Sequence, residues 1–123
     1  MIESAQPRKQ RKFRFTAPMH ERQKFLNVHI SKELRQKLST KKRAIGVRKG
    51  DTVKVMAGSH KGESGKVSSV NLRTGTVFIE NIKRKKSKGK EVLVPIYSSN
   101  LYITDLDMSD KYRKGIIERG RKV

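Results

Sequence analysis

Apolar and polar residues alternate between residues 52 and 106, and this period of two indicates half-buried strands. Val53 and Val55 alternate with polar neighbours, and the run that follows slips near Ser68, which predicts a β-bulge. Turns containing glycine separate the alternating runs, as expected between antiparallel strands. We therefore predict five short strands, over residues 52–55, 66–72, 76–82, 91–95 and 101–106.

Five short strands joined by turns favour a closed sheet. A domain of this size has little material with which to cover exposed strand edges, and closure removes those edges. The pattern therefore predicts a mainly β fold, with the five strands forming a small barrel.

The residues on either side of this region carry helix signals. Thr16 near an N-cap position and Pro18 in the first turn predict the start of a helix, and Ser31 is a second N-cap. Helices this short are not stable alone in water, so they must pack on the domain or on a partner. The predicted helices cover residues 19–28, 32–38 and 109–119.

The chain accordingly divides into three parts. Residues 1–44 form a basic extension with two short helices, residues 45–106 form the barrel, and residues 107–123 form a basic, largely helical tail. Within the extension, residues 1–15 are expected to remain extended because their positive charges repel one another. The fragment 45–123 is expected to fold without the extension.

Charge identifies the class of partner. The chain has 31 Lys and Arg and 11 Asp and Glu, a formal net charge of +20. Residues 1–49 hold 15 basic and 3 acidic side chains, and residues 83–91 hold 6 and 1, whereas residues 50–82 hold 4 and 3. So large a charge calls for a polyanion. Nucleic acid is favoured over an anionic membrane surface, because no amphipathic helix has a large apolar face.

Composition excludes several other functions. The chain has no Cys, so it forms neither disulfides nor thiolate metal sites. Its three histidines lie in different predicted elements, and no Ser or Thr has a matching His and Asp, so we expect no catalysis, metal, cofactor or small-molecule substrate. Its first twelve residues have no apolar segment of the kind a secretory signal needs, and we expect a cytoplasmic protein without a membrane anchor. The Arg-rich start leaves a mitochondrial transit peptide as a minor alternative.

Two segments combine positive charge with a shape suited to RNA. The segment 8–15 interleaves cations with Phe13 and Phe15, whose rings either stack on unpaired bases or anchor the segment on the barrel. The segment 83–90 has six cations in eight residues around a predicted hairpin tip, which favours contact with phosphates. With further residues from the extension, the glycine-rich loop and the tail, the candidate RNA-binding residues are Arg8, Lys9, Arg11, Lys12, Phe13, Arg14, His20, Arg22, Lys24, Arg35, Lys41, Lys42, Arg43, Arg48, Ser59, His60, Lys61, Lys83, Arg84, Lys85, Lys86, Lys88, Arg113 and Lys114.

The stretch Val47–Phe78 resembles the KOW motif, a strand–loop–strand unit with a fixed glycine in its loop, here Gly62. Gly58, Gly62 and Gly65 would let the loop turn tightly and bring backbone amides close to a polyanion. An ordinary glycine-rich hairpin would explain the turns but not the whole spacing. The stretch Gly62–Lys66 is not a phosphate-binding P-loop, because the glycine spacing fails and Val67 replaces the required Ser or Thr.

Beyond this motif, nearly the whole chain resembles the family of large-subunit ribosomal proteins comprising archaeal L24 and eukaryotic L26. The resemblance includes Ala17-Pro18 with His20 and Arg22, the stretch Ser31–Arg35, and Lys111–Lys114. It implies an SH3-like barrel and direct binding to large-subunit rRNA near its 5′ end. It also implies a role in starting subunit assembly, a position beside the polypeptide exit tunnel, and other large-subunit proteins as neighbours.

Two other classes of protein remain as alternatives. A transcription elongation factor with a KOW domain would need a separate α/β domain, for which residues 1–45 are too short and too basic. A nucleoid-packing DNA protein would be distinguished by comparing its binding to folded large-subunit RNA and to duplex DNA at matched salt.

Overall fold

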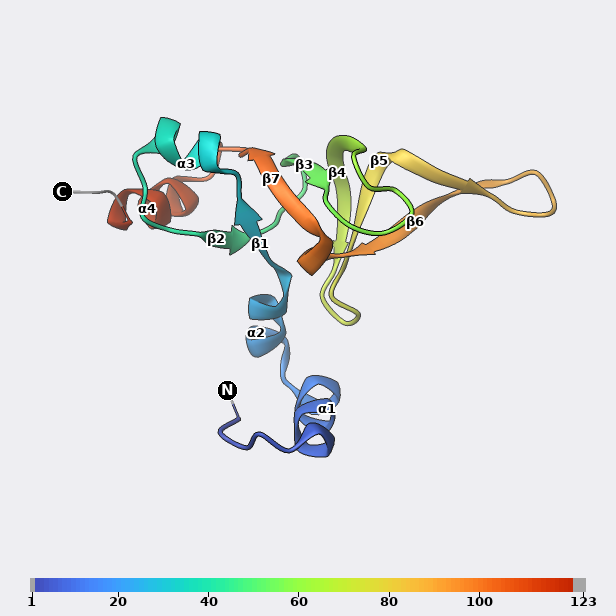
Figure 1. The fold of residues 1–123 in the computed structure, drawn as a ribbon, viewed down its shortest axis with the longest axis horizontal. Coiled ribbons are helices and arrows are strands. Elements are labelled where there is room, and N and C mark those ends of the chain that lie inside the picture. The colour runs from blue at the N-terminus through green and yellow to red at the C-terminus, as the bar shows by residue number, and fades with distance from the viewer. Residues whose placement is uncertain (1, 121–123) are drawn as a thin grey trace.

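A seven-stranded sheet forms the body of the protein, and short helices from the N-terminal third and the C-terminal end of the chain lie around it (Figure 1). The structure, a computed structural model, describes residues 2–120. The α-helices are α1 (Pro7–Thr16), α2 (Met19–Arg22), α3 (Lys32–Leu38) and α4 (Lys111–Arg119), and the short 3₁₀ helices are η1 (Gln23–Leu26) and η2 (Ser98–Asn100). The strands are β1 (Asn27–Ile30), β2 (Ala44–Gly46), β3 (Thr52–Val55), β4 (Ser64–Asn71), β5 (Thr76–Lys85), β6 (Glu91–Tyr97) and β7 (Leu101–Asp105).

The strand order is β2-β1-β7-β3-β4-β5-β6, with β1 parallel to β7 and every other pair antiparallel. The five predicted strands are present as β3 to β7. The predicted five-stranded closed barrel is not confirmed, because β2 and β6 are the two ends of the strand order within the described chain. Instead of closing on itself, the sheet is extended by β1, which pairs with the edge of β7, and by β2 beyond it.

Strand β1 begins within the last two residues of a predicted helix, at Asn27. The helical segment α2–η1 ends at Leu26 instead of continuing to residue 28. In β1 the side chains alternate between the two faces, so Val28 and Ile30 are buried while Asn27 and His29 are exposed. Pairing with β2 and β7 satisfies backbone groups of these residues, and this tertiary gain outweighs a local helical preference.

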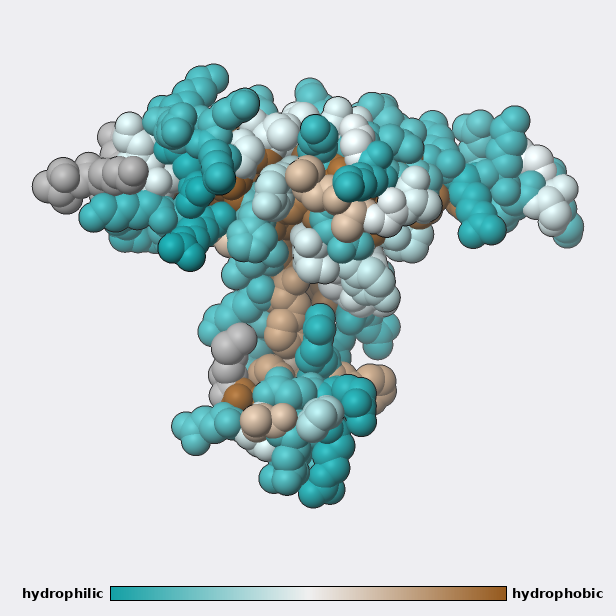
Figure 2. All heavy atoms as spheres, in the orientation of Figure 1, coloured by the Kyte–Doolittle hydropathy of each residue, from teal (hydrophilic) through white to brown (hydrophobic). Residues whose placement is uncertain are grey.

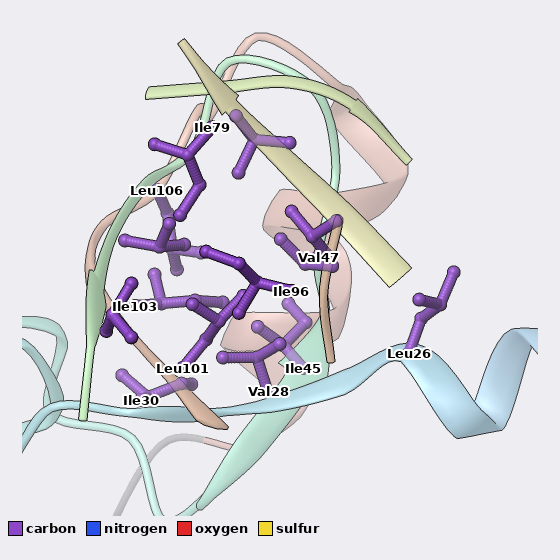
Figure 3. Packing of buried hydrophobic residues seen from close by; sticks show 14 of the residues in the cluster. Leu26, Val28, Ile30, Ile45, Val47, Ile79, Ile96, Leu101, Ile103 and Leu106 are labelled. Atoms are coloured by element: carbon purple, nitrogen blue, oxygen red, sulfur yellow. The ribbon is translucent and has the colours of Figure 1, made fainter. Parts of the chain in front are cut away.

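The hydrophobic core extends across the residue 45 boundary (Figure 3). Leu26, Val28, Ile30 and Leu34, all from the N-terminal extension, belong to the same buried cluster as the β3 residue Val53. The division at residue 45 stays a prediction, but this packing favours a boundary nearer to residue 17.

Helix α1 lies where an extended segment was expected, and in Figure 1 it stands apart from the sheet. Pro7 occupies its first turn, where the absence of an N–H costs no helical hydrogen bond. Near its end, Phe13 meets the edge of Phe25 with ring centroids 6.1 Å apart, and the Arg14 guanidinium lies 5.1 Å from the centre of the same ring. These contacts with η1 offset part of the repulsion on which the prediction of an extended chain rested.

Other local predictions are confirmed. The Ser31 hydroxyl accepts a hydrogen bond from the Leu34 amide and caps α3, whose bounds match the predicted helix. The strand register shifts between Val67 and Ser69, which is the predicted bulge. Helix α4 is present over Lys111–Arg119, and its N-cap is Asp110.

A buried ion pair attaches α4 to the sheet. The side chains of Asp51 and Arg113 are 0% and 1% exposed, and the two carboxylate oxygens lie 2.5 Å from Nη1 and Nη2 of Arg113. Arg113 also donates to the carbonyl oxygens of Gly46 and Asp107, while Asp51 accepts from the amides of Arg48 and Asp107. Arg113 is therefore part of the interior and is withdrawn from the candidate RNA-binding residues.

Candidate nucleic-acid interface

The hairpin of β5 and β6 projects from one end of the molecule, and its surface is hydrophilic (Figures 1 and 2). Pairing of Lys83, Arg84 and Lys85 with Leu93, Val92 and Glu91 keeps both arms extended. At the tip, Gly89 has φ of +86° and its amide donates to the Lys86 carbonyl. Among the described residues, no cation of this hairpin is within salt-bridge distance of a carboxylate. We call residues 83–90 the basic hairpin; all of its cations are exposed.

The glycine-rich loop between β3 and β4 is tightly turned at two positions. Gly58 and Gly62 have φ of +96° and +92°, values that favour glycine. Gly65 has a different role: it lies in β4, where a Cβ atom would approach Ile79 Cγ2 to 2.9 Å. The expectation that Gly65 helps the loop to turn is therefore wrong. Glycine is required at this position because the strand packs closely against Ile79.

Backbone amides of this loop are mostly used internally. The Gly62 amide donates to the Val55 carbonyl at 2.8 Å, and those of Lys61 and Glu63 donate to carbonyls within the loop. His60 Nδ1 lies 3.3 Å from Glu63 Oε1. These amides are therefore not available to bind an anion. The groups that the loop exposes to a partner are the side chains of Ser59 and Lys61.

Arg22 positions the segment 7–16, which we call the N-terminal arm. Its Nε donates to the Ala17 carbonyl at 2.9 Å, its Nη1 donates to the Arg73 carbonyl at 3.0 Å, and its Nη2 donates to the Phe15 carbonyl. One guanidinium thus connects the end of α1 to the turn between β4 and β5. Phe13 packs on Phe25 and anchors the arm, whereas Phe15 remains 83% exposed.

Two further basic hollows lie on the body. One, of about 840 Å³, has an apolar floor and is bordered by the candidate residues His20, Lys24 and Arg48 together with Lys49. Arg48 also forms an exposed ion pair with Asp110. The hydrogen bond from the Arg48 side chain is the main cause that lowers the pKa of the Asp110 carboxyl, and the hydrogen bond from the Tyr112 amide is the second.

The second hollow, of about 540 Å³, lies beside β1 and α3. It brings Arg35 and Arg43 together with three residues that the sequence analysis did not select: His29, Lys32 and Tyr102. The rings of His29 and Tyr102 meet edge to face, 6.1 Å apart. Their strands lie far apart in the sequence, so only the parallel pairing of β1 with β7 reveals this cluster.

The remaining candidate residues do not join these clusters. Lys41 and Lys42 lie near the end of α4, where the Lys41 amide donates to the Gly120 carbonyl, and Lys114 is exposed on that helix. This region lies at the opposite end of the molecule from the basic hairpin (Figure 1). The candidate residues are therefore spread over several separate surfaces of the described chain.

Among residues 2–120, no group of three His, Cys, Asp or Glu side chains is arranged to hold a metal ion. None of the described helices is both long and apolar enough to cross a bilayer.

The chain as a whole was compared with known protein families. A family described as ribosomal proteins L26 of eukaryotes and L24 of archaea matches residues 4–120. The chain belongs to this family. Its archaeal members include the large ribosomal subunit protein uL24 of Pyrobaculum islandicum, 44% identical over 97% of this chain and 95% of the relative. The proteins of the same name from Methanosarcina barkeri and Methanothrix thermoacetophila are 46% and 47% identical, each over 94% of this chain and 98% of the relative.

Proposed function

We propose that the protein is a non-catalytic, structural component of the archaeal large ribosomal subunit, in the cytoplasm, and that it binds large-subunit rRNA directly. The observation that carries this proposal is the match to archaeal uL24 proteins over almost the full length of both chains. The net charge of +20 and the exposed cations of the basic hairpin support RNA as the direct partner.

The mode of binding follows from the chemistry of the exposed side chains. Lysines dominate the basic hairpin, and a lysine ammonium contacts phosphate as a point charge without the bidentate geometry that reads a base edge. The hairpin therefore supplies affinity, and the shape of the folded RNA decides where the protein sits. Several separate basic surfaces would let the protein bridge RNA segments that are distant in sequence.

Finer roles belong to the same proposal. Contact near the 5′ end of the rRNA would let the protein bind as soon as that segment is transcribed, and so help to start subunit assembly. We also place the protein beside the polypeptide exit tunnel, with other large-subunit proteins as neighbours. These roles rest on the family resemblance.

Co-sedimentation tests the central proposal. The full chain, expressed with a tag in an archaeal host, should remain with large subunits after a moderate salt wash and be absent from free small subunits. Purified protein should bind folded large-subunit rRNA more tightly than duplex DNA at matched salt. Equal affinity for both nucleic acids, with no co-sedimentation, would contradict a ribosomal role and favour a DNA-packing protein.

Order-of-addition experiments test the assembly role. Adding the protein before the other large-subunit proteins should yield more complete subunits than adding it last, and the first contacts should map to the 5′ region of the rRNA. A yield independent of the order of addition would contradict an initiating role while leaving rRNA binding intact.

A further inference from the structure

Between α1 and the turn joining β4 to β5 lies an open groove of about 1040 Å³. Four of its lining side chains are arginines, three are aromatic, and none is acidic. The groove joins segments that are distant in sequence, so the charge pattern along the chain does not reveal it. We call it the arm groove; its exposed lining residues include Arg11, Phe15, Arg73 and Tyr97.

The walls of the arm groove are held in place by Arg22. Its guanidinium donates to the carbonyls of Phe15, on the arm, and of Arg73, on the β4–β5 turn. The two walls are thus connected through one side chain that is itself occupied by protein carbonyls. Tyr97 lies next to this turn because it pairs with Thr76 at the start of β5.

Two aromatic rings and two cations are left free to meet a ligand. Phe15 is 83% exposed and Tyr97 is 61% exposed, so each ring has a face that is open to stacking on a base. By contrast, the ring of Phe25 is already in contact with Phe13 and Arg14. Neither Arg11 nor Arg73 forms an ion pair among the described residues.

We propose that the arm groove binds an unpaired RNA segment, with one or more bases stacked on Phe15 or Tyr97 and the phosphates held by Arg11 and Arg73. This inference rests on the proposed RNA-binding function and specifies the form of RNA. Duplex RNA needs only cations, because its base faces are covered within the helix, whereas unpaired bases stack on aromatic side chains and on guanidinium planes. The absence of acidic side chains from the lining complements the phosphate charge.

Binding to a short single-stranded oligouridylate, of about eight nucleotides, tests the groove in the full chain. We expect Tyr97→Ala and Phe15→Ala each to weaken this binding by about fivefold or more, with no change in the salt slope, because no charge is lost. Binding to an RNA duplex with the same number of phosphates should not change. Tyr97→Phe keeps the ring and should bind as the parent does.

Tyr112→Ala is the matched control, because Tyr112 is 79% exposed but lies on α4, outside the groove. Ultraviolet cross-linking of the oligouridylate should label peptides that contain Phe15 or Tyr97. The inference is overturned if the Phe15 and Tyr97 variants bind like Tyr112→Ala, or if cross-links fall only on the basic hairpin. It is also overturned if a glutamate peptide of equal charge competes as well as the RNA. A parent protein that binds no large-subunit rRNA would instead contradict the proposed function.

Discussion

Asp51 and Arg113 show how one buried pair can place a whole segment. Both carboxylate oxygens of Asp51 accept from the guanidinium, and the same oxygens also accept from the amides of Arg48 and Asp107. Arg113 comes from α4 and Asp51 is the residue directly before β3, so this network fixes the C-terminal helix against the sheet. Arg113 stands in a basic cluster of the sequence, yet its charge is paired with Asp51 inside the protein.

We expect Asp51→Ala to lower the free energy of unfolding by about 3–5 kcal/mol, because Arg113 would remain buried without its partner. Urea unfolding followed by circular dichroism measures this change. The double variant Asp51→Leu/Arg113→Met removes both charges and should recover part of the loss, because the amides of Arg48 and Asp107 still lose their acceptor. An Asp51→Ala variant as stable as the parent would show that the pair does not hold α4.

Gly62 is a second residue whose replacement should change the stability of the protein. Its φ of +92° disfavours any side chain, although a Cβ atom there would have nothing within 4 Å. Gly62→Val should therefore lose about 1–3 kcal/mol of stability through backbone strain alone, and Gly62→Ala should lose less. Thermal melting measures both variants. If both melt like the parent, the loop does not require its left-handed geometry; Gly65→Ala should be destabilised in any case, through its clash with Ile79.

The exposed carboxyl of Asp110 makes the stability of the protein depend weakly on pH under acidic conditions. The Arg48 side chain and the Tyr112 amide lower its pKa below the ordinary value of 3.8 in the folded chain. Its stabilisation of the start of α4 is therefore complete above pH 3.8 and is lost as the pH falls through the lower folded-state pKa. Melting from neutral pH down to about pH 3 should show a larger decline for the parent than for Asp110→Asn, which keeps a capping oxygen. Parallel acid profiles would contradict this contribution.

At the scale of the element, the basic hairpin is an extension of two strands beyond the core. Ile82 is the last buried residue of β5, and the residues that follow it are exposed up to the tip. The pairing of β5 with β6 continues to Lys85 and Glu91, so backbone hydrogen bonds hold the hairpin extended without a core of its own. Such an element can carry charge outward at little cost to the fold.

Replacing Lys85, Lys86 and Lys88 with Gln should weaken binding to all RNAs to a similar degree. It should also reduce the log–log salt slope by roughly 2, since each lost phosphate contact contributes about 0.7–0.9. Filter binding over a salt series measures both quantities. The control Lys37→Gln/Lys54→Gln/Lys111→Gln removes the same charge from exposed positions outside the candidate set and should change the slope less. A loss confined to one RNA, at constant slope, would indicate base-specific recognition instead.

At the scale of the whole molecule, the N-terminal extension has two parts with different roles. Residues 7–16 form α1, which has no buried residue, whereas Leu26, Val28, Ile30 and Leu34 are buried in the common core. Burying four such side chains contributes roughly 6–12 kcal/mol. That amount is comparable to the entire stability of a typical domain, about 5–15 kcal/mol.

We therefore expect fragment 17–123 to unfold cooperatively and fragment 45–123 to be unfolded or to aggregate. Circular dichroism melting and size-exclusion chromatography distinguish the two. Removal of residues 1–16 deletes five basic side chains, so the salt slope of rRNA binding should fall by up to roughly 4. A cooperative transition in fragment 45–123 would instead support the boundary drawn from the sequence.

Local elements were predictable because local interactions determine them. Ser31 and the residues after it carry their own capping signal, and the turn at Gly75 needs a positive φ wherever the hairpin is placed. The alternation of Val53 and Val55 likewise predicted a buried face without any knowledge of the partner strand. Of the candidate interface, the basic hairpin could be predicted for the same reason, since its charge and its turn lie in one continuous segment.

The amino-acid pattern alone predicted the strands from residue 52 onward, the helices α3 and α4 and the basic hairpin, and it predicted nucleic acid as the class of partner. Tertiary structure decided what depends on distant residues: β1 is a strand because β7 offers an edge, and Arg113 is buried because Asp51 lies opposite it. It also decided that the sheet ends in two edges and that Phe15 and Tyr97 border one groove. The physical reason is that a local pattern reports the preference of a segment, whereas pairing, burial and ion pairing depend on which other segment occupies the space beside it.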